Sequence, residues 1–289
     1  MTDSTPVTRN STRSTRSKNS IAVTLLLLFV IALCIVYMFP FYIMIMNTLK
    51  TGKEVAMNPI ALPSHLYLDN YINAFKKMNL LVSFKNSFLI TFSSVTIIVL
   101  FGAMAAYPVA RLQNKWTNLV LIYFLLGFMV PIQTTIVPLF LVMQKLSLIN
   151  SLPGMILIYS ANCVFSFFMY QAFIRSVPKE LEEAAFIDGY SLWGTFWKIV
   201  FPLLKPITVT IIIFETMWIW NDFMFAYLFL HSKNKTTLVL EIFKGVGEFA
   251  NDWSLMLSIM VIVLIPVVVF YVFMQKHIIA GLTSGALKG

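Results

Sequence analysis

Four side chains that could contact a polar solute lie within one apolar run. The run from Pro206 to Leu230 contains Glu215, Trp218, Asn221 and Asp222. An ionisable group within a membrane span costs about 2.5–3.5 kcal/mol on insertion scales, so such groups face protein or water. Helical spacing predicts Glu215, Trp218 and Asp222 on one face. These side chains could border a path for a solute with hydroxyl groups and apolar ring faces. Alternatively, they could hydrogen-bond across helices and hold a bundle together.

The patterns that indicate an enzyme are absent from the sequence. No G-x-x-x-x-G-K-[S/T] motif for nucleotide phosphates occurs, and Gly245-Val246-Gly247 lacks the third glycine and the strand context of a dinucleotide site. His65, His231 and His277 are far apart, and neither H-E-x-x-H nor G-x-S-x-G is present. No motif for nucleic acid is present either. We therefore expect a non-catalytic chain that binds no metal, no cofactor and no nucleic acid.

The composition is that of a membrane protein. Of the 289 residues, 59% are apolar and 11% are charged, and the mean hydropathy is +0.83. Soluble domains carry about 25% charged residues, so an ordinary cytosolic enzyme is excluded. A membrane-crossing helix needs about 20 apolar residues, which predicts an all-α polytopic protein with six transmembrane helices. The predicted spans are Ile21–Leu49, Asn86–Ala110, Trp116–Gln144, Leu146–Ile174, Pro206–Leu230 and Trp253–Gln275.

Polar segments divide the chain between these spans. Arg9, Arg13, Arg16 and Lys18 lie before the first span, and basic residues favour the cytoplasmic side. This predicts both termini inside, although Lys and Arg are distributed only slightly in favour of that side. The organisation is a disordered basic tail at 1–20, a first transmembrane helix at 21–49, an outer loop at 50–85, a five-helix core at 86–275 and a cytoplasmic tail at 276–289. The core includes an inner loop at 175–205 and an outer loop at 231–252.

The inner loop at 175–205 has the signals of two short helices. Lys179–Asp188 is a helix-forming run, Gly189 provides a stop, and Ser191 is typical of a second cap before Leu192–Phe201, which ends at Pro202. Small alanines in the first helix allow another protein to approach closely. The alternative is an amphipathic hairpin on lipid headgroups, but four acidic residues argue against contact with an anionic leaflet. They are Glu180, Glu182, Glu183 and Asp188.

The same loop carries a family resemblance. Glu183-Ala184-Ala185, Gly189, Ile199 and Phe201-Pro202 resemble the EAA loop, E-A-A-x3-G-x9-I-x-L-P, of permease subunits in binding-protein-dependent ABC importers. The only departure is Phe201 in place of Leu. Three further segments are similar to the smaller six-span permease of the maltose and oligosaccharide type, and the resemblance covers roughly residues 20–289. These segments are Trp220-Asn221-Asp222-Phe223, Asp252-Trp253 and Gly281–Gly289.

The resemblance implies a type I ABC importer permease fold, in which the EAA loop is inserted into a cytoplasmic ATPase subunit. Glu183 would pair with a basic residue there, Ala184 and Ala185 would pack closely, and Gly189 would allow the turn. Phe201 replaces one apolar residue by another. Ile199 and Pro202 complete the implied coupling set.

The resemblance also implies the partners and the location. These are a second permease subunit, two ATP-binding subunits that hydrolyse ATP, an extracytoplasmic solute-binding protein and the lipid of a bacterial or archaeal cytoplasmic membrane. The tail at Gly281, Gly285 and Lys288 would reach the ATPase interface, and the outer loop at 231–252 would contact the solute-binding protein. The implied function is uptake of sugars or oligosaccharides.

Other transporter classes remain open from the residues alone. The solute could be a polyol or glycerol phosphate, because importers of other solutes share the EAA loop. An ion-coupled secondary transporter would use Glu215 for coupling, but six spans without an internal repeat argue against it. An intramembrane hydrolase would need a nucleophile and a base that the sequence lacks.

Overall fold

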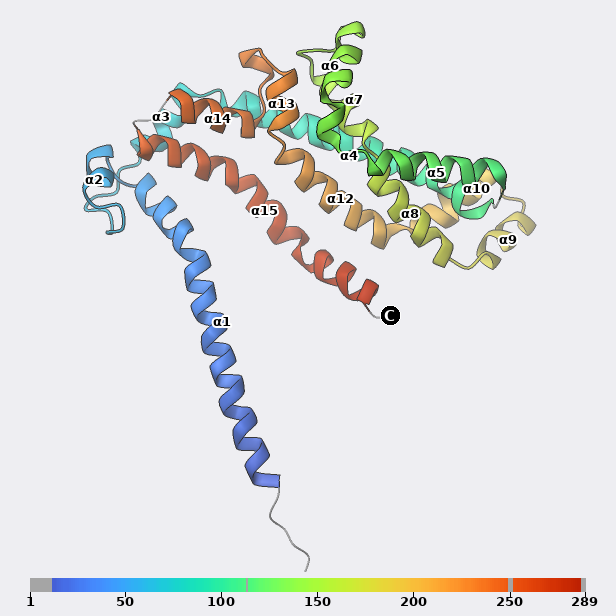
Figure 1. Cartoon of the computed structure of the whole chain (residues 1–289), viewed down its shortest axis with the longest axis horizontal. Helices are drawn as coiled ribbons and strands as arrows, with labels where there is room; N and C mark the ends of the chain where they lie inside the picture. The colour runs from blue at the N-terminus through green and yellow to red at the C-terminus, as the bar shows by residue number, and fades with distance from the viewer. Residues whose placement is uncertain (1–11, 113, 249–251, 287–289) are drawn as a thin grey trace, which may run out of the picture.

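The computed structural model describes residues 12–112, 114–248 and 252–286, and within these ranges all regular secondary structure is helical. Three helices are long and apolar enough to cross a membrane alone (Figure 1). They are α1 (Thr12–Thr48), α4 (Leu80–Arg111) and α15 (Trp253–Ala286). Helix α1 begins nine residues before the predicted span at Ile21, so helical backbone covers part of the predicted tail, and residues 1–11 of that tail lie outside the described ranges.

The other apolar runs form bent pairs of helices, whereas the sequence predicted one transmembrane helix for each run. The third run is bent by 94° between α5 (Lys115–Met129) and a segment composed of the 3-10 helix η1 (Ile132–Thr135) and α6 (Ile136–Lys145). Pro131 lies at this bend, where its missing N–H prevents the helix from continuing. The fourth run is bent by 43° between α7 (Leu152–Ala161) and α8 (Val164–Ser176). If each bent pair is one span, the structure has up to six spans by length and composition.

The fifth run is also interrupted, so the prediction of one helix through Leu230 was wrong. Helix α12 (Lys205–Trp220) ends at Asn221, and the shorter α13 (Met224–Phe229) follows. At its other end, α12 meets the preceding helical segment at 73°.

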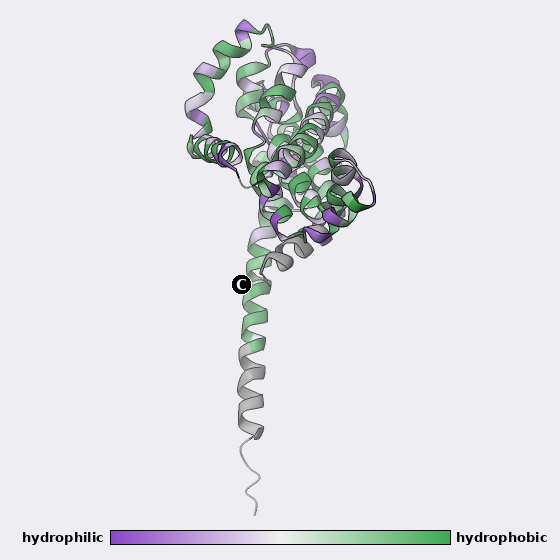
Figure 2. Cartoon of the chain, turned by 90° about the vertical axis from the view of Figure 1, so that its right-hand side faces the viewer, coloured by the Kyte–Doolittle hydropathy of each residue, from purple (hydrophilic) through white to green (hydrophobic). Residues whose placement is uncertain are grey.

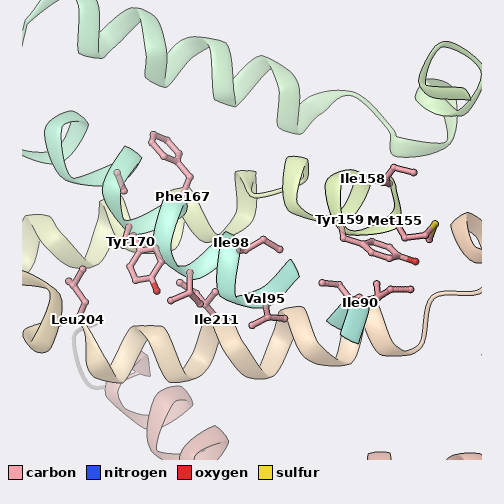
Figure 3. Close-up of a cluster of buried hydrophobic side chains, with 14 of the residues drawn as sticks. Ile90, Val95, Ile98, Met155, Ile158, Tyr159, Phe167, Tyr170, Leu204 and Ile211 are labelled. Carbon is pink, nitrogen blue, oxygen red and sulfur yellow. The ribbon is translucent and has the colours of Figure 1, made fainter. Parts of the chain in front are cut away.

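The main core lies around α4. Large buried side chains from α7, α8 and α12 pack on it, among them Tyr159, Phe167, Tyr170 and Ile211 (Figure 3). At Gly102 of α4, an added Cβ would lie only 3.1 Å from Ser166 Oγ of α8. Close approach through small residues is the usual way in which helices pack in membranes.

Helix α1 extends away from this body (Figures 1 and 2). Every side chain from Val23 to Phe41 is exposed, and burial begins near the end of the helix at Asn47 and Thr48. The segment after α1 folds over this end through α2 (Gly52–Met57) and α3 (Asp69–Lys77).

Buried polar side chains hold that fold together. Asn70 Nδ2 donates hydrogen bonds to the carbonyl oxygens of Thr48 and Lys50, both at 2.8 Å. Lys50 is fully buried, and its Nζ donates to Asn47 Oδ1 at 3.2 Å and to the Asn58 carbonyl oxygen at 2.9 Å.

Two short helices complete the described chain near the start of α15. They are η3 (Lys233–Lys235), which lies against α4, and α14 (Leu238–Glu248), which packs with α3, α4 and α15 in a second, smaller core. Glu241 of α14 is buried.

Candidate functional site

A pair of short helices projects from the body between α8 and α12. We call it the helix pair, residues 180–203. It comprises α9 (Glu180–Ile187), α10 (Leu192–Thr195), the π-helical turn η2 (Phe196–Val200) and α11 (Phe201–Leu203). Gly189 has φ +85°, a left-handed conformation that favours glycine, and Ser191 Oγ accepts a hydrogen bond from the Gly194 N–H at 3.2 Å. The two helices and the turn lie where the sequence places them, but the second helix continues past Pro202 to Leu203.

The helix pair presents an apolar surface to its surroundings. Ile187 is 86% exposed, which is unusual for a large aliphatic side chain on a folded protein. Contiguous exposed apolar side chains mark a surface that contacts another molecule. The other exposed apolar side chains of this surface are Leu181, Phe186, Leu192 and Trp193.

Two neighbouring glutamates of α9 have opposite environments. Glu183 is exposed, whereas Glu182 is buried and forms an ion pair with Arg111 at the end of α4, with 2.5 Å between Arg111 Nη2 and Glu182 Oε1. Tyr107 of α4 donates its hydroxyl to Glu182 Oε2 at 2.7 Å, and Arg111 Nη2 also donates to the Val177 carbonyl oxygen at 3.0 Å. The helix pair is therefore fixed to α4 through Glu182.

The other residues of the predicted coupling set divide between the two faces of the helix pair. Ala184, Gly189 and Pro202 are exposed along with Glu183. Ala185 is buried, and Ile199 is half-buried. The four exposed residues are thus accessible to a partner.

The break between α12 and α13 is held by Asp222. Its Oδ2 accepts hydrogen bonds from the N–H groups of Phe225 and Ala226 at 3.0 and 3.3 Å, as expected for a residue that caps a helix. The same oxygen accepts the hydroxyl of Tyr159 on α7 at 2.8 Å. These contacts are those of a residue that holds helices together.

Although α12 ends before Asp222, Trp218 and Asp222 both contact Tyr159 of α7. Trp218 is partly exposed, and its ring meets Tyr159 edge-on at 5.8 Å between centroids. Glu215 is buried, and among the described residues nothing forms a hydrogen bond or an ion pair with its carboxyl group. Asn221 is exposed at the end of α12.

A groove of about 850 Å³ lies between α4, α12 and α15. Its walls are mostly apolar and include Phe88 and Phe92 of α4, Trp220 of α12 and Phe270 of α15. Of the four predicted path residues, Asn221 alone lines it. The indole N–H of Trp220 is buried without a hydrogen-bond partner among the described residues.

Comparison with known proteins identifies the type of subunit. The profile described as "Binding-protein-dependent transport system inner membrane component" matches residues 98–284. The chain belongs to this family. The permease is 37% identical over 279 residues to the melibiose/raffinose/stachyose import permease protein MelC of Bacillus subtilis (strain 168), which covers 96% of this chain and 100% of MelC.

A second relative and a solved structure agree with this assignment. The probable starch degradation products transport system permease protein AmyC of Thermoanaerobacterium thermosulfurigenes is 33% identical over 259 residues, with 89% of the permease and 94% of AmyC covered. A chain of a bacterial ABC transporter involved in the import of the acidic polysaccharide alginate has the same fold. Its TM-score is 0.78 at 22% identity, over 93% of the permease and 99% of that chain. The permease thus has the type I ABC importer permease fold.

The predicted tail site is only partly described. Gly281 and Gly285 belong to the helical backbone of α15, and Lys288 lies outside the described residues.

Sequence reasoning missed the contact between Glu182 and Arg111. The two residues are 71 positions apart, and each belongs to a segment that was interpreted only as charged surface. One signal was available. Glu182 and Ala185 are three residues apart and so share a helical face, which is the face that is buried in the structure.

Proposed function

We propose that the permease is one of two membrane subunits of an ATP-driven importer for a sugar or oligosaccharide, in the cytoplasmic membrane of a bacterium or archaeon. Family membership supports the importer. The names of MelC and AmyC, which refer to oligosaccharides and starch products, support the class of solute. A polyol or another small solute is the alternative within the same family.

In this proposal the permease crosses the membrane six times with both termini inside. The three long helices and the bent pairs supply enough apolar length for six spans. The helix pair is then cytoplasmic, and the loop that contains η3 and α14 lies outside, where it faces the solute-binding protein. ATP is hydrolysed by two separate subunits, and this chain catalyses no reaction.

The observation that carries the proposal is the helix pair itself. It presents Glu183, a small alanine and large exposed apolar side chains, while Glu182 fixes its other face to α4. A rigid projection of this kind can convert closure of the ATPase subunits into a rigid-body movement of the spans. We propose that Glu183 pairs with a basic residue of the ATPase and that Ala184 and Gly189 allow close approach.

The path for the solute forms between this chain and the second permease. Glu215, Trp218 and Asn221 contribute polar and aromatic groups, since Glu215 is buried with its carboxyl group unpaired by the described residues. Asp222 contributes indirectly, because it caps α13.

Uptake by cells that depend on this permease tests the proposal. The solute panel is melibiose, raffinose, stachyose and a maltooligosaccharide, and we expect uptake of at least one of them. In proteoliposomes of the purified complex, vanadate should abolish that uptake and an ionophore should leave it unchanged. The opposite pattern of inhibition would establish an ion-coupled transporter instead.

Variants of the same preparation separate the two candidate sites. Glu183→Ala should lower uptake about tenfold or more by weakening a central interface contact, whereas Glu180→Ala on the same helix should not. Normal uptake by Glu183→Ala would remove the coupling role. Glu215→Gln should lower uptake with the complex intact, and an unchanged rate and affinity would remove Glu215 from the path.

A further inference from the structure

Helix α4 carries a cluster of buried polar contacts at each end. At the Arg111 end, Tyr107 and Arg111 hold Glu182 of α9, as described above. The ring of Tyr107 also packs on buried Phe196 of η2, at 5.2 Å between ring centroids. One turn of α4 thus contacts both halves of the helix pair.

The Leu80 end of α4 is fixed to the segment that follows α13. Asn86 Nδ2 donates to the carbonyl oxygens of Asn234 and Thr236 at 3.0 and 2.9 Å. Ser83 Oγ lies 2.7 Å from Thr236 Oγ1 and hydrogen-bonds to it, and the Leu238 N–H donates to Ser87 Oγ at 2.9 Å. Ser83, Asn86 and Ser87 are all buried, so these contacts are shielded from competition by water. We call residues 231–238 the outer loop segment.

The helix between these clusters is continuous and well packed. Ser87 and Tyr107 are 20 residues apart, which corresponds to roughly 30 Å along the helix axis. Ile98, Ala103 and Ala106 between them are fully buried against the main core. Close-packed interiors transmit displacement and do not absorb it. A shift of the Arg111 end of α4 can therefore be carried along the helix to the outer loop segment.

We infer that α4 is a rigid rod that transmits the movement of the helix pair to the outer loop segment. The inference rests on the proposed function, in which the helix pair contacts the ATPase and the outer loop segment faces the solute-binding protein. Tyr107 and Arg111 are positioning residues at one end, and Ser83, Asn86 and Ser87 are positioning residues at the other. Through this rod the nucleotide state of the ATPase alters a surface on the opposite side of the membrane.

Hydrogen–deuterium exchange of the complete purified complex in lipid nanodiscs tests this inference. Exchange is compared without nucleotide and after trapping with ATP and vanadate. In the wild type we expect trapping to change the exchange rate both in the helix pair and at the Leu238 amide. The expected change at Leu238 is about fivefold or more, the lower range of measured coupling between distant sites.

Variants at the inner end give the decisive comparison. Glu182→Gln should leave the trapping response of the helix pair in place and reduce the response at Leu238 to less than about twofold. Glu182→Asp keeps the charge and should restore most of the response at Leu238. The matched control is Glu180→Gln, an exposed residue of the same helix, which should behave as the wild type. If Glu182→Gln fails to assemble, Tyr107→Phe removes only the hydroxyl donor and should reduce the response at Leu238 in the same direction.

The outcomes distinguish the inference from the function on which it rests. Absence of any trapping response in the helix pair would refute the proposed coupling function. A response in the helix pair without one at Leu238 in the wild type would refute the rod. A full response at Leu238 in an assembled Glu182→Gln or Tyr107→Phe complex would refute it as well.

Discussion

Helices α1 and α4 are both single apolar helices, 37 and 32 residues long, but they are held in the molecule in different ways. Helix α4 has a buried stripe of small and polar residues and is fixed at both ends. Helix α1 has Leu, Ile, Val and Phe on all sides, is exposed from Val23 to Phe41, and its long-range hydrogen bonds within the described ranges start at Tyr42. Small and polar residues along a span therefore mark a helix that packs against protein. The stripe of α4 contains Ser83, Ser94, Gly102, Ala103 and Ala106.

The largest expected effect is a loss of stability when a small residue is replaced by valine in α4, compared with the same kind of replacement in α1. Gly102→Val should lower the free energy of unfolding by about 2 kcal/mol, because overpacking a close contact forces neighbours apart. Even the first added carbon would lie 3.1 Å from Ser166 Oγ. Ala32→Val in exposed α1 should change the free energy of unfolding by less than about 0.5 kcal/mol. Unfolding of the purified permease in mixed micelles with increasing SDS measures both, and equal losses would contradict the comparison.

The second-largest expected effect concerns the anchor of α1, by which we mean the hydrogen bonds of Asn70 to the end of this helix. Asn70→Ala removes two hydrogen bonds and leaves the buried carbonyl oxygens of Thr48 and Lys50 unsatisfied, so we expect a loss of about 1.5 kcal/mol. Faster hydrogen exchange of the amides near Lys50 should accompany it. Asn58→Ala is the control, since its exposed side chain is removed while the carbonyl oxygen used by Lys50 remains. Equal hydrogen exchange of these amides in the two variants would show that the hydrogen bonds of Asn70 do not hold the end of α1.

The smallest effect concerns pH and the segment that covers this anchor. The Ser64 N–H donates to Glu54 Oε1 at 2.7 Å, and this hydrogen bond lowers the pKa of Glu54 below 4.5. Because the pKa of Glu54 is lower in the folded state, the ionised side chain stabilises the fold above the unfolded value of 4.5. This stabilisation is lost as the pH falls through the folded value. Because Glu54 is only half-buried, the effect is local. We expect the exchange protection factor of the Ser64 amide to decline on acidification in the wild type, and to be low at every pH in Glu54→Ala. Constant protection in the wild type down to strongly acidic pH would exclude this hydrogen bond as the cause.

The sequence predicted the elements whose signals are local. The apolar runs gave α1, α4 and α15 as uninterrupted helices. Gly189 and Ser191 marked the turn in the helix pair, because a left-handed residue and an N-cap depend on their immediate neighbours. The EAA pattern predicted the family, and the profile match and the relatives confirmed it.

Features that depend on distant partners were not predictable in the same way. The bends at Pro131 and Asn162 were missed for a different reason, because counting uncharged residues ignores residues that break a helix, such as proline. The role of Asp222 required the knowledge that Tyr159 lies beside it. Pairing of Glu182 with Arg111 likewise depends on how α4 and α9 meet in space, and the two adjacent glutamates look equivalent until then. The roles of Glu183, Glu215 and the tail glycines stay predictions.

The one-sided attachment of α1 has a consequence for biosynthesis. Its exposed length needs only a lipid environment, so this first helix can enter the bilayer as soon as it emerges from the ribosome, before any later part of the chain exists. Its first long-range tertiary hydrogen bond joins the Tyr42 hydroxyl to the Ile60 carbonyl oxygen. The bonds from Asn70 to Thr48 and Lys50 follow only when Asn70 has been synthesised. Insertion and tertiary folding are thereby separated in time. Helix α1 can thus remain inserted in the membrane while the spans that pack against protein assemble more slowly beside it.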